Sequence, residues 1–114
     1  MEDYHEIEHG PDMKGCLNLA FHQWHKLPTA LFSFGMSLKI LDLSHNRVPN
    51  LPSDFGNLVA IRELNLSYNK LVQIDAVSML NRLQRLNVSH NLLSSIPKDI
   101  FSHCTMLVRG ILNM

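Results

Sequence analysis

The sequence predicts an α/β repeat solenoid, in which short stacked units each contribute one parallel strand. Three observations predict it. Leucine accounts for nineteen of the 114 residues, an eleven-residue pattern recurs along the chain, and apolar and polar residues alternate within each copy of that pattern. Five glycines, five prolines and a hydrophobic share of 46% exclude a fibrous or disordered chain, and the length allows a single domain.

The repeat is visible in three consecutive segments, LKILDLSHNRV from Leu38, IRELNLSYNKL from Ile61 and LQRLNVSHNLL from Leu83. Their starts lie 23 and 22 residues apart. The same register extends backwards to a degenerate leading unit and forwards to a truncated unit that begins at Leu107. We therefore expect a repeat domain over residues 14–114, preceded by an acidic, flexible leader of residues 1–13.

The pattern L-x-x-L-x-L-x-x-N-x-L at a stride of 22 to 24 residues resembles that of the leucine-rich repeat family. The resemblance implies a right-handed coil with short parallel strands on its concave face and irregular, 3-10 or short helical segments on its convex face. It also implies a non-catalytic module that needs no cofactor and binds a protein partner through the concave face. The segments after each Asn look like those of cytoplasmic members that act as scaffolds in signalling.

Each unit is expected to contain a short strand such as Leu41-Asp42-Leu43, with its leucines on one side. Parallel strands stacked about 4.8 Å apart bring these leucines into one core that no single unit closes alone. Asn46, Asn69 and Asn91 fall where the strand must turn. Their side-chain amides can pair the backbone groups that the bend leaves unsatisfied, so we expect a structural role for them.

The second half of each unit should return along the outer face. Prolines at 28, 52 and 97 suit such an irregular path, because a missing N–H is harmless there. The segment from Ala76 to Leu80 has no proline, and Val77 and Leu80 form an apolar i, i+3 pair. This segment is therefore the best candidate for a true helical turn.

Residues between the buried leucines should form outward-facing columns across the stacked strands. A column at the strand exits carries four rings, of the kind enriched at interaction hot spots. The alternative is that these positions are merely solvated. The predicted partner-binding surface combines the rings with polar, charged and apolar residues of the strands: Phe21, Ile40, Asp42, His45, Arg62, Glu63, Tyr68, Arg85, Asn87 and His90.

Charge and cysteine content suggest the class of partner and the compartment. Ten basic and ten acidic residues give a net charge of zero, which argues against nucleic acid as a partner. The first residues do not resemble a secretory signal, and no apolar stretch approaches the ~18 residues of a membrane span. With only Cys16 and Cys104 available, we expect two free thiols and a cytoplasmic protein that does not contact a membrane.

One motif suggests an enzyme. His5-Glu6-Ile7-Glu8-His9 fits the H-E-x-x-H signature of zinc peptidases. A working site needs a helix beside a third ligand, whereas Gly10-Pro11 ends any helix here and the remaining residues belong to repeats. We therefore expect no metal site and no catalysis.

The last unit stops within its strand pattern, before its Asn. An uncapped strand offers unpaired backbone to another chain, so we expect possible association through this C-terminal edge. The alternative to a free-standing interaction module is a fragment or truncated isoform of a larger leucine-rich repeat receptor or multidomain enzyme, whose chemistry lies outside this chain.

Overall fold

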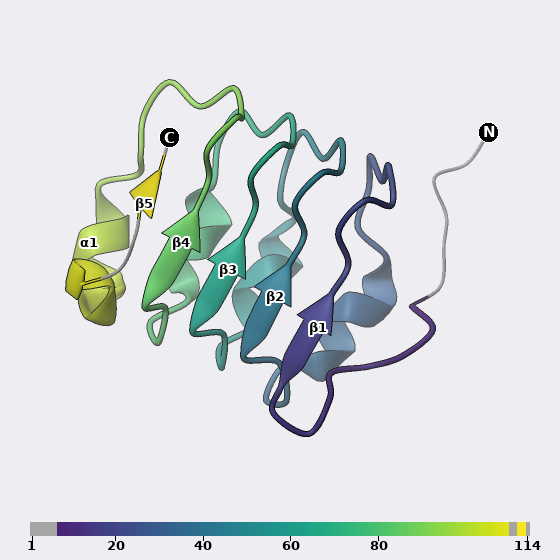
Figure 1. Ribbon diagram of the computed structural model, residues 1–114. Helices are drawn as coiled ribbons and strands as arrows, with labels where there is room; N and C mark the ends of the chain where they lie inside the picture. Colours follow the sequence, from purple (N-terminus) through teal and green to yellow (C-terminus); the bar gives the residue numbers. More distant parts are fainter. Residues whose placement is uncertain (1–6, 110–111, 114) are drawn as a thin grey trace.

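A computed structural model describes residues 7–109 and 112–113. Its strands form one parallel sheet in the order β1-β2-β3-β4-β5, so that each strand pairs with the next one along the chain (Figure 1). The predicted solenoid is confirmed. The strands are short and evenly spaced along the chain: β1 (Cys16–Asn18), β2 (Ile40–Asp42), β3 (Glu63–Asn65), β4 (Arg85–Asn87) and β5 (Leu112–Asn113).

The register of β1 to β4 follows the sequence repeat. Leu41 pairs with Leu64, and Leu64 pairs with Leu86, so the central leucine of each strand lies beside its equivalent. These three side chains are at most 3% exposed. A slip of one residue would turn the leucines to the solvent, which explains why the buried pattern determines the register so firmly.

The last unit departs from this register, and the expected start of the truncated unit at Leu107 is wrong by two residues. Leu107 lies in a helical segment, Thr105–Arg109, and Leu112 pairs with Leu86. The difference arises because two helical segments lengthen this last return path.

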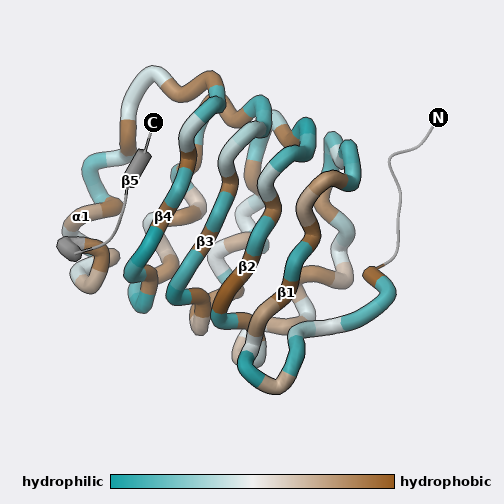
Figure 2. The backbone as a smooth tube through the Cα atoms, viewed as in Figure 1, coloured by the Kyte–Doolittle hydropathy of each residue, from teal (hydrophilic) through white to brown (hydrophobic). Residues whose placement is uncertain are grey.

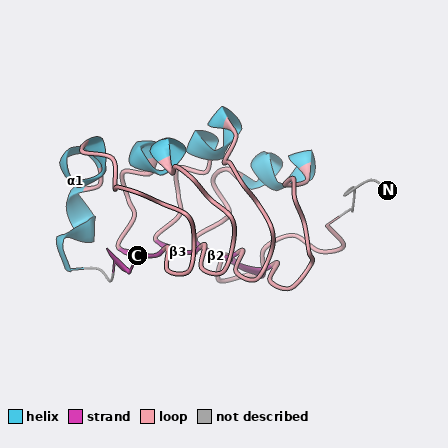
Figure 3. Ribbon diagram, turned by 90° about the horizontal axis from the view of Figure 1, so that it is seen from above, coloured by secondary structure: helices cyan, strands magenta, loops and turns pink. Residues whose placement is uncertain are grey.

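Helical segments cover the side opposite the sheet (Figure 3). Each return path from β1 to β4 places one of them on this convex side, and the path from β4 to β5 places two. Within the described ranges none is long and apolar enough to cross a membrane. Four are 3-10 helices and one is a single α-helical turn: η1 (Thr29–Phe34), η2 (Ser53–Asn57), η3 (Asp75–Met79), α1 (Asp99–His103) and η4 (Thr105–Arg109).

The expected helical turn at Ala76–Leu80 is a 3-10 helix instead. Its backbone N–H groups donate to the third preceding carbonyl, as from Val77 to Ile74 at 2.9 Å. The α-helical turn lies one unit later, where Cys104 N donates to the Ile100 carbonyl four residues back at 2.9 Å. This α-helical turn lies in the longest unit, in which 26 residues separate Leu86 from its partner Leu112, whereas the shorter units contain 3-10 helices. A 3-10 helix advances about 2.0 Å per residue, more than an α-helix, so it spans the convex side with fewer residues.

The core lies between the sheet and the convex helices. It consists mainly of the repeated leucines, and Figure 2 shows apolar segments recurring at equivalent places in successive units. Larger rings fill the space beneath the convex side. Phe55 is fully buried and meets Phe32 edge-on, with ring centroids 6.3 Å apart. Because each unit buries its apolar face against its neighbours, the stability of one unit depends on the next.

The asparagine column links consecutive units. Asn46 Nδ2 donates to the carbonyls of Leu19 and Leu43, both at 3.0 Å, and Asn46 Oδ1 accepts from the backbone N–H of Trp24 at 3.1 Å. Asn69 and Asn91 repeat this arrangement one and two units later. The predicted structural role of these residues is confirmed.

Residues 7–13 run beside the first unit, and Ile7 packs against the core. A turn leads from this segment into β1. Asp12 Oδ1 accepts from the backbone N–H groups of Lys14 at 2.9 Å and Cys16 at 3.0 Å. These bonds, chiefly the one from Cys16, lower the pKa of the Asp12 carboxyl. Gly15 completes the turn with φ +82°, a conformation that favours glycine.

Candidate functional site

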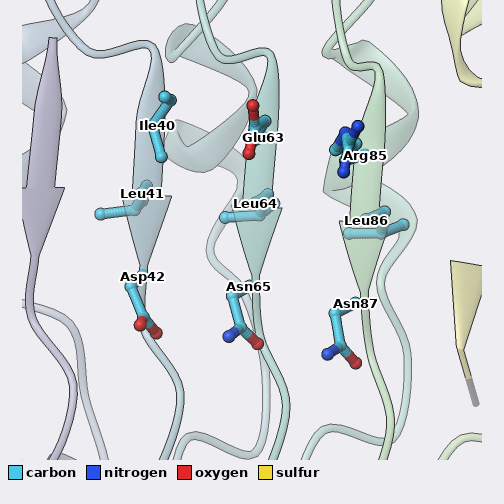
Figure 4. Close-up of a pocket in the computed structure, with 9 residues that line it drawn as sticks. All are labelled: Ile40, Leu41, Asp42, Glu63, Leu64, Asn65, Arg85, Leu86 and Asn87. Carbon is cyan, nitrogen blue, oxygen red and sulfur yellow. The ribbon is translucent and has the colours of Figure 1, made fainter. Parts of the chain in front are cut away.

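The concave surface of the sheet contains a shallow depression of about 290 Å³. Its lining comes from three equivalent strands, β2, β3 and β4 (Figure 4). One row across these strands reads Ile40, Glu63, Arg85, and the next polar row reads Asp42, Asn65, Asn87. An apolar, an acidic and a basic side chain therefore stand side by side on a rigid floor. Such a mixed surface suits selective contact with another polar surface.

Hydrogen bonds hold the polar row in place. In each unit the side-chain oxygen of this row accepts from both the backbone N–H and the hydroxyl of the serine two residues later. The hydroxyl bond measures 2.6 Å from Ser44 to Asp42 and 2.7 Å from Ser67 to Asn65. The same pair recurs between Ser89 and Asn87. Side chains fixed before binding lose little conformational freedom on contact with a partner.

The four predicted rings form one continuous stack along the strand exits. Successive ring centroids lie 4.1, 4.4 and 4.1 Å apart, and the ring planes are within 11° of parallel. The exposed fraction is 72% for Phe21 and 47% for Tyr68, so the stack presents a substantial surface to solvent. We call this stack of Phe21, His45, Tyr68 and His90 the ring ladder.

The backbone explains how these rings come together. Phe21, His45, Tyr68 and His90 have φ between 57° and 63°, in the left-handed region that residues other than glycine enter at a cost of about 1 to 2 kcal/mol. Bonds to the next unit hold this conformation, as from His45 N to the Ser67 carbonyl at 3.1 Å. One sharp turn per unit therefore presents every ring at the same height on neighbouring units.

The structure divides the predicted surface into separate parts. Ile40, Asp42, Glu63, Arg85 and Asn87 line the concave depression, whereas the ring ladder lies at the rim. Arg62 belongs to neither. It lies just before β3, where its exposed side chain is at the strand entry and its carbonyl accepts from Gln84 and Arg85 of the next unit.

Sequence reasoning missed a second column beside the ring ladder. Arg47 and Lys70 follow His45 and Tyr68 by two residues, and both are exposed. Together with Gln23 they line a depression of about 410 Å³ that also contains the four rings. The repeat stride already places these positions in register, so the same column analysis, extended past each Asn, would have found them.

Both cysteines are free thiols, as predicted. Cys16 lies half-buried in the concave row of Ile40, and Cys104 is fully buried on the convex side. Burial raises the pKa of the Cys104 thiol, which disfavours the reactive thiolate. In the H-E-x-x-H segment, His5 and Glu6 lie outside the described residues, so the structure does not place the motif.

The parallel sheet, the asparagine column and the polar concave surface define the chain as a solenoid built to present a surface. Two family models, both described as leucine rich repeat, match residues 16–71 and 82–104. The chain belongs to the leucine-rich repeat family, as its sequence pattern predicted. Domains of this kind generally serve as protein–protein interaction modules.

Several relatives are much longer proteins. Toll-like receptor 10 of Bos taurus is 34% identical over 95 residues, which cover 82% of this chain and 11% of the receptor. Adenylate cyclase of Schizosaccharomyces pombe is 38% identical over 90 residues, which cover 75% of this chain and 5% of the cyclase. Among solved structures, the Drosophila Toll–Spatzle complex matches with a TM-score of 0.70 and 25% identity, over 89% of this chain and 15% of that chain. The chain therefore spans only a small part of each.

The expected cytoplasmic location is wrong. The similarity to Toll-like receptors and Toll, membrane receptors whose leucine-rich repeats are extracellular, points away from the cytoplasm. The expectation depended on first residues that do not resemble a secretory signal, on the low cysteine content and on the form of the return segments. None of these distinguishes compartments here, because the chain spans only 11% of the receptor and a core of stacked leucines needs no disulfide in either environment.

Proposed function

We propose that this chain is a non-catalytic module that binds a protein partner through its concave face. The contact surface would comprise the depression on β2, β3 and β4 together with the ring ladder. The net charge of zero argues against nucleic acid. Family membership supports the general role, and the match to Toll in its complex with Spatzle supplies a related solenoid seen with a protein ligand.

One observation carries the proposal: the concave surface is exposed, chemically varied and locked by hydrogen bonds. Asp42, Asn65 and Asn87 are each held by a serine of the same unit. Four ring-bearing turns keep the left-handed conformation although it costs energy. A sheet surface that is merely solvated needs neither fixed polar side chains nor left-handed turns. A preformed recognition surface benefits from both, because its side chains are already in place when the partner binds.

A second candidate is a recognition segment of a larger receptor or multidomain enzyme. The small share of each relative that this chain covers favours it, since those relatives are a receptor and a cyclase many times longer. In this case the repeats would recognise a ligand, in signalling, while any chemistry lay outside residues 14–114. The division into an acidic leader of residues 1–13 and a repeat domain from residue 14 forms part of both candidates.

Affinity capture with quantitative mass spectrometry tests the concave-face proposal. The wild-type chain is compared with a concave variant, Tyr68→Ala plus Arg85→Ala, and with a convex control, Met79→Ala plus Phe101→Ala. All four side chains are exposed, so each variant should keep its fold. We expect the concave variant alone to lose partners. Equal capture by all three proteins, or a loss confined to the convex control, would show that the concave face is not the contact surface.

Association through the C-terminal edge is a separate proposal. Within the described residues, β5 pairs only with β4, which leaves its other edge to accept a strand. Size-exclusion chromatography with light scattering over a range of concentrations measures this association. A monomer at every concentration would contradict it.

A further inference from the structure

We propose that the depression beside the ring ladder binds a carboxylate-rich segment of a protein partner. We call this depression the rim groove. It is lined by the ring ladder, by the exposed column of Gln23, Arg47 and Lys70, and by the buried Asn46 and Asn69, which lie between the two. The inference depends on the proposed function, because it specifies the chemistry of one part of the partner.

The stacking of the rings determines which of their atoms a ligand meets. Each interior ring of the ladder has both faces covered by neighbours at 4.1 to 4.4 Å. The exposed parts of these two interior rings, His45 and Tyr68, are therefore their edges, which form the positive region of an aromatic quadrupole. Tyr68 also has a hydroxyl donor at its edge, and His45 and His90 have ring nitrogens there. Such a surface favours an electron-rich ligand, such as a carboxylate oxygen.

Charge supports the same assignment. Arg47 and Lys70 are exposed, and none of the residues that line the rim groove is acidic. Asp42, three residues before His45, does not line the rim groove, and its Oδ1 accepts from the backbone N–H and hydroxyl of Ser44. The rim groove is therefore a basic site on a chain whose net charge is zero.

The backbone places the two cations in adjacent units. Arg47 N donates to the Trp24 carbonyl at 2.7 Å, and Lys70 N donates to the Val48 carbonyl at 3.0 Å. Adjacent units lie about 4.8 Å apart at the sheet, and carboxylates on one side of an extended peptide repeat every ~7 Å. The flexible side chains of Arg and Lys are long enough to make up the difference between these two spacings. A peptide that crosses the units can therefore pair an acidic residue with each cation.

The number of cations favours a peptide over a polyanion. A nucleic acid depends on many phosphate contacts, whereas this groove offers two cations beside four rings. A volume of about 410 Å³ accommodates several side chains of an extended segment. A protein segment with acidic residues and intervening uncharged ones therefore matches both the charge and the rings.

Fluorescence anisotropy with a labelled (Glu-Ser)₄ peptide tests the proposal on the full chain at low ionic strength. The neutral peptide (Gln-Ser)₄ serves as the ligand control. The rim variant is Arg47→Gln plus Lys70→Gln. The matched control, Arg82→Gln plus Lys98→Gln, removes the same charge from exposed positions away from the rim groove. Circular dichroism and thermal melting verify that both variants fold like the wild type.

We expect the acidic peptide to bind and the neutral one not to bind. The rim variant should weaken binding about fivefold to tenfold, while the matched control changes it less than about twofold. Tyr68→Leu should also weaken binding, because it removes a ring edge and a donor. Equal losses in the two charge variants, or no binding of the acidic peptide, would overturn the proposal.

Inorganic phosphate distinguishes carboxylate from phosphate as the preferred anion. At equal concentration of negative charge, phosphate should displace the labelled peptide less well than the unlabelled peptide does. Better displacement by phosphate overturns the carboxylate assignment. The two proposals can fail separately, since absent peptide binding leaves the capture contrast between concave and convex variants intact. Loss of that contrast contradicts the proposed function whatever the peptide does.

Discussion

Asn69 Nδ2 donates to the carbonyl of Leu43, 26 residues earlier in the chain, at 3.0 Å. The same side chain accepts from the backbone N–H of Val48 at 3.1 Å. Asn69 is 5% exposed, so water has little access to these groups. One side-chain amide therefore joins two successive units at the turn, where the backbone groups no longer have partners in the sheet.

Replacing this amide should destabilise the fold. We expect Asn69→Ala to lower the free energy of unfolding by about 3 kcal/mol, because Val48 N–H and Leu43 C=O lose a buried partner. Asn91→Ala should cost less, since Asn91 is only half-buried. Asn50→Ala, at an exposed position, is the control and should change stability by less than about 0.5 kcal/mol. Urea unfolding followed by circular dichroism measures all three, and equal effects would contradict the structural role of the column.

Gly15 should tolerate no side chain. A Cβ there would lie 2.9 Å from the Ser37 carbonyl oxygen and 3.0 Å from Lys39 Cβ, and the backbone has φ +82°. We expect Gly15→Ala to destabilise the protein by about 2 kcal/mol, from strain and the close contact together. Lys14→Ala, one residue earlier and exposed, should leave the melting temperature nearly unchanged. Equal melting temperatures for the two variants would show that the turn adapts.

Asp12 should titrate below the ordinary value of 3.8 for its carboxyl. The folded state favours the charged form, because backbone N–H groups of Cys16 and Lys14 donate to it. The stabilisation from this group is therefore present above pH 3.8 and is lost as the pH falls through the lower folded pKa. NMR titration of the side-chain carboxyl, assigned with Asp12→Asn, measures the midpoint. A midpoint at or above 3.8 would contradict the bonded turn.

The two thiols should differ in reactivity. Cys16 is half-buried on the concave face and should react with DTNB in the native protein. Cys104 should react only when the fold opens, because it is fully buried and its thiol has a raised pKa. The variants Cys16→Ser and Cys104→Ala assign the two kinetic phases. Two equally fast phases without denaturant would mean that the convex side opens readily.

Much of the fold could be predicted from the pattern because one rule recurs in every unit. Leu41, Leu64 and Leu86 share a position in the repeat, so their pairing in the sheet follows from the stride alone. The ring column was visible for the same reason. The kind of helix at residues 75–79 could not be predicted in this way. The choice between a 3-10 and an α-helical turn depends on the distance that the chain must span and on the number of residues available to span it.

The candidate site was less predictable than the fold. Arg62 was included because it is charged and lies near β3, yet it lines neither depression. Arg47 and Lys70 follow the Asn of their units, outside the strand pattern on which the predicted surface depends. Their importance depends on the left-handed turns at His45 and Tyr68, and a preference for that conformation is weak in residues other than glycine.

The sequence by itself determined the solenoid, the register of β1 to β4 and the asparagine column, because each depends on residue type at a repeated spacing. Only the tertiary structure decided that the rings stack face to face and line a groove with two exposed basic side chains. The physical reason is that burial follows period and polarity, which are local properties of the chain. Surface geometry depends instead on backbone angles and on contacts between units more than twenty residues apart.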